Sequence, residues 1–329
     1  MSDAATTTSM PPGAAPASRT STRKSGPFVR SDGFTDRLLV GATGSACVLM
    51  LAMLAIVLLD IVVGGAPRIS FEFLSEAPSN GMTAGGIFPA IVGTAILTFL
   101  MTFAAVPAGV ATAVYLTEYA PSNSRLARVI RVSIANLAGV PSIVFGLFGL
   151  GFFVSTLGRA IDVTIFEGEL TFARPSLLWA ALTLSVLTLP VVVVATEEAL
   201  RAVPRELRDA SLALGATRFE TVVRIVLPEA LGGILTGAIL AVSRGAGEVA
   251  PIMFTGAAYF LPQLPTHLND AFMNLGYHVY VLATQSPDVE KTKPILYGTA
   301  LVLLLLTFLL NVVAVIVRSR TRGKLKPAL

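Results

Sequence analysis

The chain has 329 residues, of which 54% are hydrophobic and 13% are charged, and its formal net charge is +4. An average soluble domain carries about 25% charged residues, so this composition excludes an ordinary water-soluble fold. The excess positive charge falls in segments between apolar runs and therefore does not indicate a nucleic-acid-binding protein. The single cysteine, Cys47, excludes an intrachain disulfide bond.

Residues 1–36 are rich in Ala, Ser, Thr and Pro and show no apolar periodicity. This composition predicts a disordered N-terminal tail. The apolar run that follows is too long, and lies too far from the N-terminus, for a typical cleaved signal peptide. We therefore expect it to remain as the first membrane span.

Apolar stretches recur along residues 37–318. A transmembrane helix needs roughly 20 consecutive apolar residues. Six stretches meet this requirement and predict an all-α membrane protein with six transmembrane helices: 38–59, within 77–117, 132–158, 175–196, 230–258 and 294–317. Residues 319–329 form a basic C-terminal tail.

The basic residues indicate the orientation of these spans. Of the 24 Lys and Arg residues, 18 lie in the two tails and in the loops after the second and fourth spans. Short loops rich in Lys and Arg stay on the cytoplasmic side. We therefore expect both termini to be cytoplasmic.

The loop between the fourth and fifth spans, residues 197–228, carries strong helix signals. Pro204 suits the first turn of a helix, and Gly215 suits a helix end. Thr217 and Glu220 have the spacing of a capping box, which begins a second helix. A rigid helix–glycine–helix unit favours docking to a partner protein over a plain solvated connector.

The same loop resembles the coupling loop of ATP-binding-cassette (ABC) importer permeases. That pattern is E-A-A, three residues, Gly, nine residues and then I-x-L-P. Asp and Ser replace the first and third residues of E-A-A here. The resemblance implies that the following residues couple the chain to an ATPase: Asp209, Ala210, Ser211, Gly215, Thr217, Glu220, Ile225, Leu227 and Pro228.

Four further runs, at 117–121, 136–146, 197–208 and 243–255, are similar to phosphate-importer permeases of the PstA type. This resemblance implies a type I ABC importer permease fold and a non-catalytic subunit of the bacterial inner membrane that translocates inorganic phosphate into the cytoplasm. It also implies three partners: an ATPase homodimer that binds ATP and Mg, a second homologous permease, and an extracytoplasmic phosphate-binding protein. This chain itself would bind no cofactor. Permeases for sulfate, molybdate or phosphonate remain alternatives.

Two charges, Arg244 and Glu248, lie inside the expected fifth span. Such charges are costly in a bilayer and usually face a cavity or a partner. Their spacing of four places them on one helix face, where they can pair. The pair is either a structural ion pair or part of a translocation pathway, in which the guanidinium matches phosphate oxygens. Arg201, at the end of the fourth span, is either an orientation signal or an anion contact at the exit.

Three lesser features complete the pattern. Gly233 and Gly237 form a G-x-x-x-G motif that permits close helix packing. The loop 259–293 is expected outside the cell, with a short amphipathic helix at 270–284 that contacts a binding protein or rests on the membrane. His267 and His278 lack metal-site spacing and are interpreted as ordinary loop residues.

The chain contains no G-x-x-x-x-G-K-[ST] phosphate loop, so it is not expected to hydrolyse ATP alone. A polytopic membrane enzyme is a second hypothesis, but no set of catalytic polar groups assembles at one membrane face. A channel or secondary transporter is a third, and it leaves the rigid 197–228 loop unexplained.

Overall fold

The computed structural model describes residues 33–121, 123–286 and 288–325, and the remainder of the two expected tails lies outside these residues. Within the described residues, all regular structure is helical except a short antiparallel pair, β1 (Pro78–Ser79) and β2 (Ala84–Gly85). Six helical segments are long and apolar enough to cross a membrane, which confirms the predicted number. They are Thr35–Arg68, Phe88–Tyr119, Ser142–Ile165, Leu177–Ala202, Arg218–Gly245 and Val289–Thr321.

The first span is helix α1 (Gly33–Gly65), which begins inside the range expected for the tail. Its part up to Ile56 forms a compact unit of its own, and the rest of the chain from Val57 forms the second. Its sequence is almost entirely apolar from Leu38 to Leu59, as a membrane-spanning helix requires.

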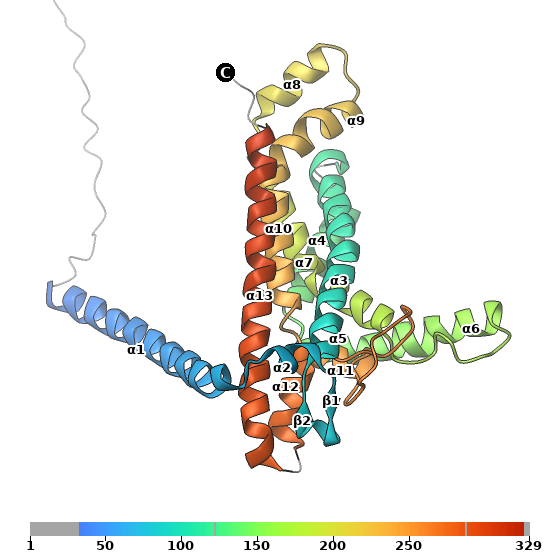
Figure 1. The fold of residues 1–329 in the computed structure, drawn as a ribbon. Helices are drawn as coiled ribbons and strands as arrows, with labels where there is room; N and C mark the ends of the chain where they lie inside the picture. Colours follow the sequence, from blue (N-terminus) through green and yellow to red (C-terminus); the bar gives the residue numbers. More distant parts are fainter. Residues whose placement is uncertain (1–32, 122, 287, 326–329) are drawn as a thin grey trace, which may run out of the picture. The chain divides into compact units, whose positions relative to one another are not determined.

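The core of the second unit is built on α3 (Phe88–Val114) and α7 (Leu177–Ala202), which pack along their lengths (Figure 1). Helix α10 (Leu227–Gly245) packs on α7 through small residues. A Cβ atom on Gly233 or Gly237 would clash with Ala199 or Ala195, so the predicted G-x-x-x-G packing face is confirmed. Close backbone approach through glycine is a common way for membrane helices to associate.

The third span begins later than predicted. Residues 125–138 form a separate amphipathic helix, α4 (Arg125–Ala138), capped by Ser124. Gly139 and Pro141 then interrupt the chain, because proline disfavours helix at the preceding residue. The span itself consists of α5 (Ser142–Phe148), a π-helical segment at Gly149–Gly158, and α6 (Arg159–Ile165).

Two more π-helical segments lie in other spans, at Tyr115–Tyr119 and Val222–Val226. π-helical turns are rare and frequently mark functional sites. The second of them joins α9 (Arg218–Thr221) to α10 without a break, so these elements form one continuous helix.

The end of the molecule opposite α8 and α9 contains α2 (Phe71–Ser75), the strand pair and α12 (Leu275–Thr284) (Figure 1). The helix expected at 270–284 starts later than predicted, and it packs against other helices where a surface position was expected. Asn274 caps a helix that starts at Leu275, and Leu275, Val281 and Leu282 are buried against α3 and α13 (Val289–Leu325).

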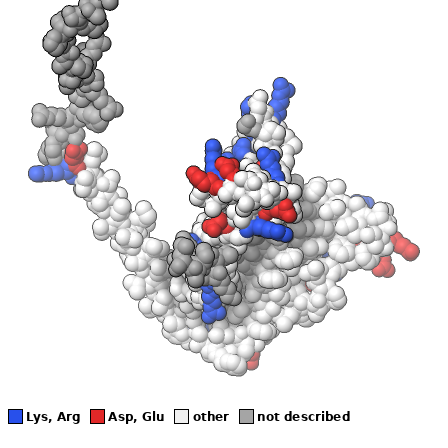
Figure 2. Space-filling view, turned by 90° about the horizontal axis from the view of Figure 1, so that it is seen from above, with Lys and Arg blue, Asp and Glu red and all other residues white. Residues whose placement is uncertain are grey.

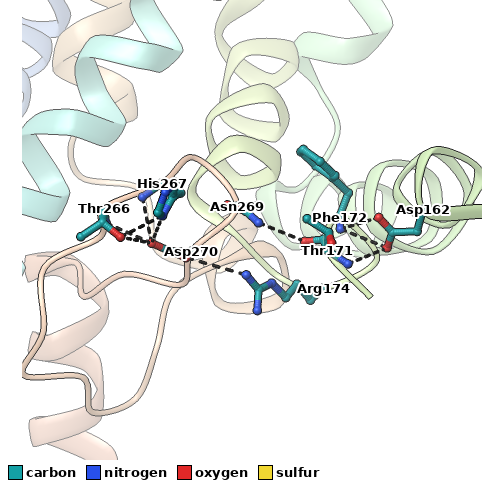
Figure 3. A network of polar contacts seen from close by, with 8 residues as sticks. All are labelled: Asp162, Thr171, Phe172, Arg174, Thr266, His267, Asn269 and Asp270. Atoms are coloured by element: carbon teal, nitrogen blue, oxygen red, sulfur yellow. Dashed lines mark hydrogen bonds and ion pairs between the residues drawn. The ribbon is translucent and has the colours of Figure 1, made fainter. Parts of the chain in front are cut away.

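Two loops at this end are joined by polar contacts (Figure 3). The buried carboxylate of Asp162 accepts hydrogen bonds from three successive backbone N–H groups, Thr171, Phe172 and Ala173, at 2.7–3.0 Å. Arg174 then pairs with Asp270 at 3.7 Å. A hydrogen bond from the backbone N–H of His267 holds the pKa of the Asp270 carboxyl below its usual value.

Candidate translocation site and coupling element

The fifth span is broken near the middle of the bundle. Helix α10 ends at Gly245, and a short helix, α11 (Ala250–Thr255), follows after an irregular stretch. A Cβ on Gly245 would meet Met101 and Thr188, which lie at the midpoints of α3 and α7. The stretch 246–249 therefore lies level with the midpoints of two membrane-spanning helices, where irregular backbone is tolerated only if it lines a cavity or is buried in protein.

Arg244 and Glu248 lie at this break and form an ion pair with a nitrogen–oxygen distance of 3.6 Å. Their predicted pairing is confirmed, but their placement on one continuous helix is wrong. Gly245 and Gly247 favour a helix end, and Pro251 favours the start of the next helix. The Arg244 side chain is 42% exposed and that of Glu248 is 20% exposed, so the pair is open on one side.

The loop after α7 forms the expected rigid element at one end of the molecule (Figure 1). Helix α8 (Arg205–Ala213) is followed by Gly215, whose φ of +89° is a left-handed conformation that favours glycine. Thr217 and Glu220 form the predicted capping box, with the Thr217 N–H donating to Glu220 Oε2 at 2.9 Å. The helix–glycine–helix prediction is thus confirmed.

The element presents an apolar outer surface. Leu214 is 90% exposed and Phe219 is 66% exposed, and a shallow cavity of about 540 Å³ lies beside Leu207 and Leu214. Seen from this end, charged side chains are gathered over the element, and the surrounding surface is mostly uncharged (Figure 2). Large exposed apolar side chains among polar residues indicate a protein-interaction surface.

The residues expected to couple to an ATPase divide into two groups. Asp209, Ala210, Gly215 and Thr217 are exposed on the element. The others are partly buried: Ser211, Glu220, Ile225, Leu227 and Pro228. The Ser211 and Thr221 hydroxyls lie 2.9 Å apart and join α8 to α9.

Arg201 lies at the end of α7 nearest this element. It pairs with Glu197 at 2.9 Å, and Glu197 also accepts from Arg131 of α4 at 3.3 Å. Arg201 and Arg244 are not brought together. Thr188, beside the break, precedes Arg201 by 13 residues, which is about 20 Å along a helix.

Arg208 is a central residue that the sequence pattern did not reveal. Its guanidinium donates to the backbone oxygens of Leu200 and Val203, each at 2.7 Å, and pairs with Glu118 at 2.9 Å. It therefore ties α8 to the end of α7 and to the π-helical turn that ends the second span. Glu118 is 90 residues away in sequence, so no local motif could have identified the pair.

His278 was wrongly interpreted as a loop residue. It lies on α12 with 2% of its surface exposed, and burial lowers its pKa to about 4. The described residues contain no cluster of His, Cys, Asp and Glu that could hold a metal ion.

The model of one protein family, the binding-protein-dependent transport system inner membrane component, matches residues 105–323. The chain belongs to this family. It is a multi-pass protein of the bacterial inner membrane.

Curated relatives of this inner membrane component cover most of its length. A probable ABC transporter permease of Bacillus subtilis, YqgI, is 34% identical over 85% of this chain and 94% of its own. The phosphate transport system permease PstA of Haemophilus influenzae is 30% identical over 82% and 89%. PstA 1 of Mycobacterium tuberculosis H37Rv is 37% identical over 71% and 70%.

Solved structures show that this inner membrane component has the ABC importer permease fold. A bacterial ABC transporter that imports alginate is 15% identical, with a TM-score of 0.63 over 87% of this chain and 96% of that one. The MetNI methionine transporter is 20% identical, with a TM-score of 0.52 over 70% and 94%. The family match includes both the broken span and the α8–α9 element.

Proposed function

We propose that this chain is one permease subunit of an ATP-driven importer that carries inorganic phosphate into the cytoplasm. The importer class rests on the capped α8–α9 element with its exposed Leu214, in a chain of this family. The assignment of phosphate as the substrate rests on the relatives, several of which are named phosphate transport permeases.

In this proposal both termini and the α8–α9 element are cytoplasmic, because the basic loops and tails stay on that side. An ATPase homodimer, which binds ATP and Mg, docks on the outer surface of the element. A second homologous permease and an extracytoplasmic phosphate-binding protein complete the importer. This chain binds no cofactor.

The broken fifth span supports a role in the translocation pathway. The α9–α10 helix connects the proposed docking surface directly to the break at 246–249. Movement of the ATPase would shift this helix and alter access to the break, as in alternating-access transporters.

Arg244 is the proposed anion contact in that pathway. A guanidinium donates two parallel hydrogen bonds to phosphate oxygens, and its charge persists at all physiological pH values. Glu248 competes with phosphate for the same guanidinium, because its carboxylate pairs with Arg244 at 3.6 Å. That competition favours release, which a pathway requires. Arg201 is the proposed second contact near the cytoplasmic exit.

The test combines co-purification with transport. The tagged chain is purified from detergent-solubilised membranes, and uptake of radiolabelled phosphate is measured with and without its gene. We expect an ATPase to co-purify and phosphate uptake to be lost on deletion. An ATPase without a phosphate defect would redirect the substrate to sulfate, molybdate or phosphonate. If no ATPase co-purifies, the membrane-enzyme and secondary-transporter hypotheses would replace the importer.

A pair of variants tests the docking surface. Leu214→Asp places a charge at the most exposed apolar side chain of the element and should abolish ATPase co-purification. Leu170→Asp, at a 72% exposed leucine in the loop between α6 and α7, is the matched control and should leave it unchanged. Equal recovery of the ATPase with both variants would contradict docking at α8–α9.

A further inference from the structure

A second cavity, of about 550 Å³, lies between α8, α9 and the ends of the second and fourth spans. It is distinct from the shallow cavity on the outer surface of the element. The charged residues that line it are Glu118, Arg201, Arg205, Arg208, Asp209 and Arg218.

Helix α8 separates the two cavities. Arg205, Arg208, Asp209 and Leu212 line the inner one, and Leu207, Ala210, Ser211 and Leu214 line the outer one. Both sets have the spacing i, i+3, i+4, i+7 of a single helix face, and the sets lie on opposite faces. The two cavities therefore lie on different sides of α8.

The charges of the inner cavity are not balanced. Its lining contains four arginines and two carboxylates. Arg208 is occupied by Glu118 and two carbonyls, and Arg201 by Glu197. Among the described residues, Arg205 and Arg218 form no ion pair, so their guanidinium groups are available to a ligand from two different helices.

These observations indicate an anion as the ligand. Guanidinium groups bind phosphate through parallel charge-assisted hydrogen bonds, which are stronger than hydrogen bonds between neutral groups. A cavity of this volume holds an inorganic phosphate with its waters, or the head group of a phospholipid that enters from the membrane surface at the ends of the spans. Both sources present the same phosphate chemistry.

We propose that this cavity, which we call the arginine pocket, binds a phosphate-bearing anion through Arg205 and Arg218. The bound anion bridges α8 to α9 and adds to the contacts by which Arg208 holds α8 against α7. The pocket faces the cytoplasm if the orientation in the proposed function is correct, but binding itself does not depend on transport.

The test uses the purified transporter complex in nanodiscs of phosphatidylcholine, without ATP or external binding protein. Binding of radiolabelled inorganic phosphate is measured by equilibrium dialysis. The double variant Arg205→Gln/Arg218→Gln should weaken binding about tenfold or more, because it removes the two free charged donors. Arg125→Gln/Arg128→Gln makes the same charge change on exposed arginines of α4 and should leave binding unchanged. Both comparisons are made in an Arg244→Gln background, so that phosphate held by the proposed pathway contact does not contribute to the measured binding.

A second arm distinguishes the two sources of phosphate. If a lipid head group occupies the pocket, nanodiscs containing phosphatidic acid will suppress the binding of inorganic phosphate, and the double variant will retain less phosphatidic acid on purification. If the ligand is free phosphate, the lipid will have no effect.

Equal phosphate and lipid binding by the wild-type and double-variant complexes would overturn the proposal. A complex that binds phosphate at the pocket, from a strain whose phosphate uptake is unaffected by deletion, would refute only the proposed transport function.

Discussion

Replacement of Arg208 by glutamine should release α8 from the membrane spans. The substitution removes a charged donor that makes two hydrogen bonds of 2.7 Å to carbonyls and one ion pair of 2.9 Å. Hydrogen bonds to charged groups contribute about 1.5–3 kcal/mol each. Since the Arg208 side chain is 19% exposed and glutamine retains part of the bonding, we expect a net loss of about 2–4 kcal/mol in the local stability of α8.

Hydrogen–deuterium exchange of the purified complex measures this local stability directly. A loss of about 2–4 kcal/mol corresponds to roughly 30- to 1,000-fold faster exchange of the α8 amides. Arg205→Gln is the matched control, because Arg205 lies three residues away and its side chain forms no hydrogen bond or ion pair with the described residues; it should change exchange by about twofold or less in phosphate-free buffer. Glu118→Gln should reproduce part of the effect.

Two outcomes would refute the reasoning. Equal exchange in Arg208→Gln and Arg205→Gln would show that the contacts of Arg208 do not hold α8. Full additivity of Arg208→Gln and Glu118→Gln in a double-mutant cycle would show that the two side chains do not interact, because partners in one ion pair couple by about 0.5–3 kcal/mol.

Three further predictions concern other parts of the chain. Gly215→Ala forces a left-handed conformation on alanine at a cost of about 1–2 kcal/mol, and should speed amide exchange at the α8–α9 turn; unchanged exchange would contradict this. For Arg244, a lysine replacement should retain more phosphate uptake than glutamine, whereas equal loss with intact folding would indicate that the two-pronged guanidinium geometry is required. Because the folded-state pKa of His278 is about 4 against an ordinary 6.5, the unfolded chain binds the proton first, and the free energy of unfolding should fall as pH drops from 6.5 towards 4, by about 3 kcal/mol in full. Thermal unfolding against pH should lose this slope in His278→Gln and keep it in His267→Gln, and a slope retained by both would refute the assignment.

Local chemistry was readable from the sequence wherever the relevant residues are neighbours. The turn at Gly215 and the capping box at Thr217 and Glu220 depend on residues at most five positions apart, and both are present in the structure. The number of spans was predictable for a similar reason, because a bilayer crossing imposes a minimum apolar length.

Features that depend on packing were not predictable. The depth of the break at 246–249 in the bundle is an example, because it depends on how α10 lies against α3 and α7. The Arg208–Glu118 pair joins distant segments. Residues 275–284 have an apolar face in any setting, and only the tertiary structure shows that protein covers it instead of lipid.

The continuity of α9 with α10 has a mechanical consequence. The segment Arg218–Gly245 contains 28 residues, so it is a rod of about 40 Å. A tilt of about 10° around its outer end would carry the inner end through roughly 7 Å, more than the width of a phosphate ion. A small rotation at the surface of the molecule therefore produces a displacement of several ångströms at the centre of the bundle. The stiffness of this helix determines how much of the imposed rotation reaches its inner end.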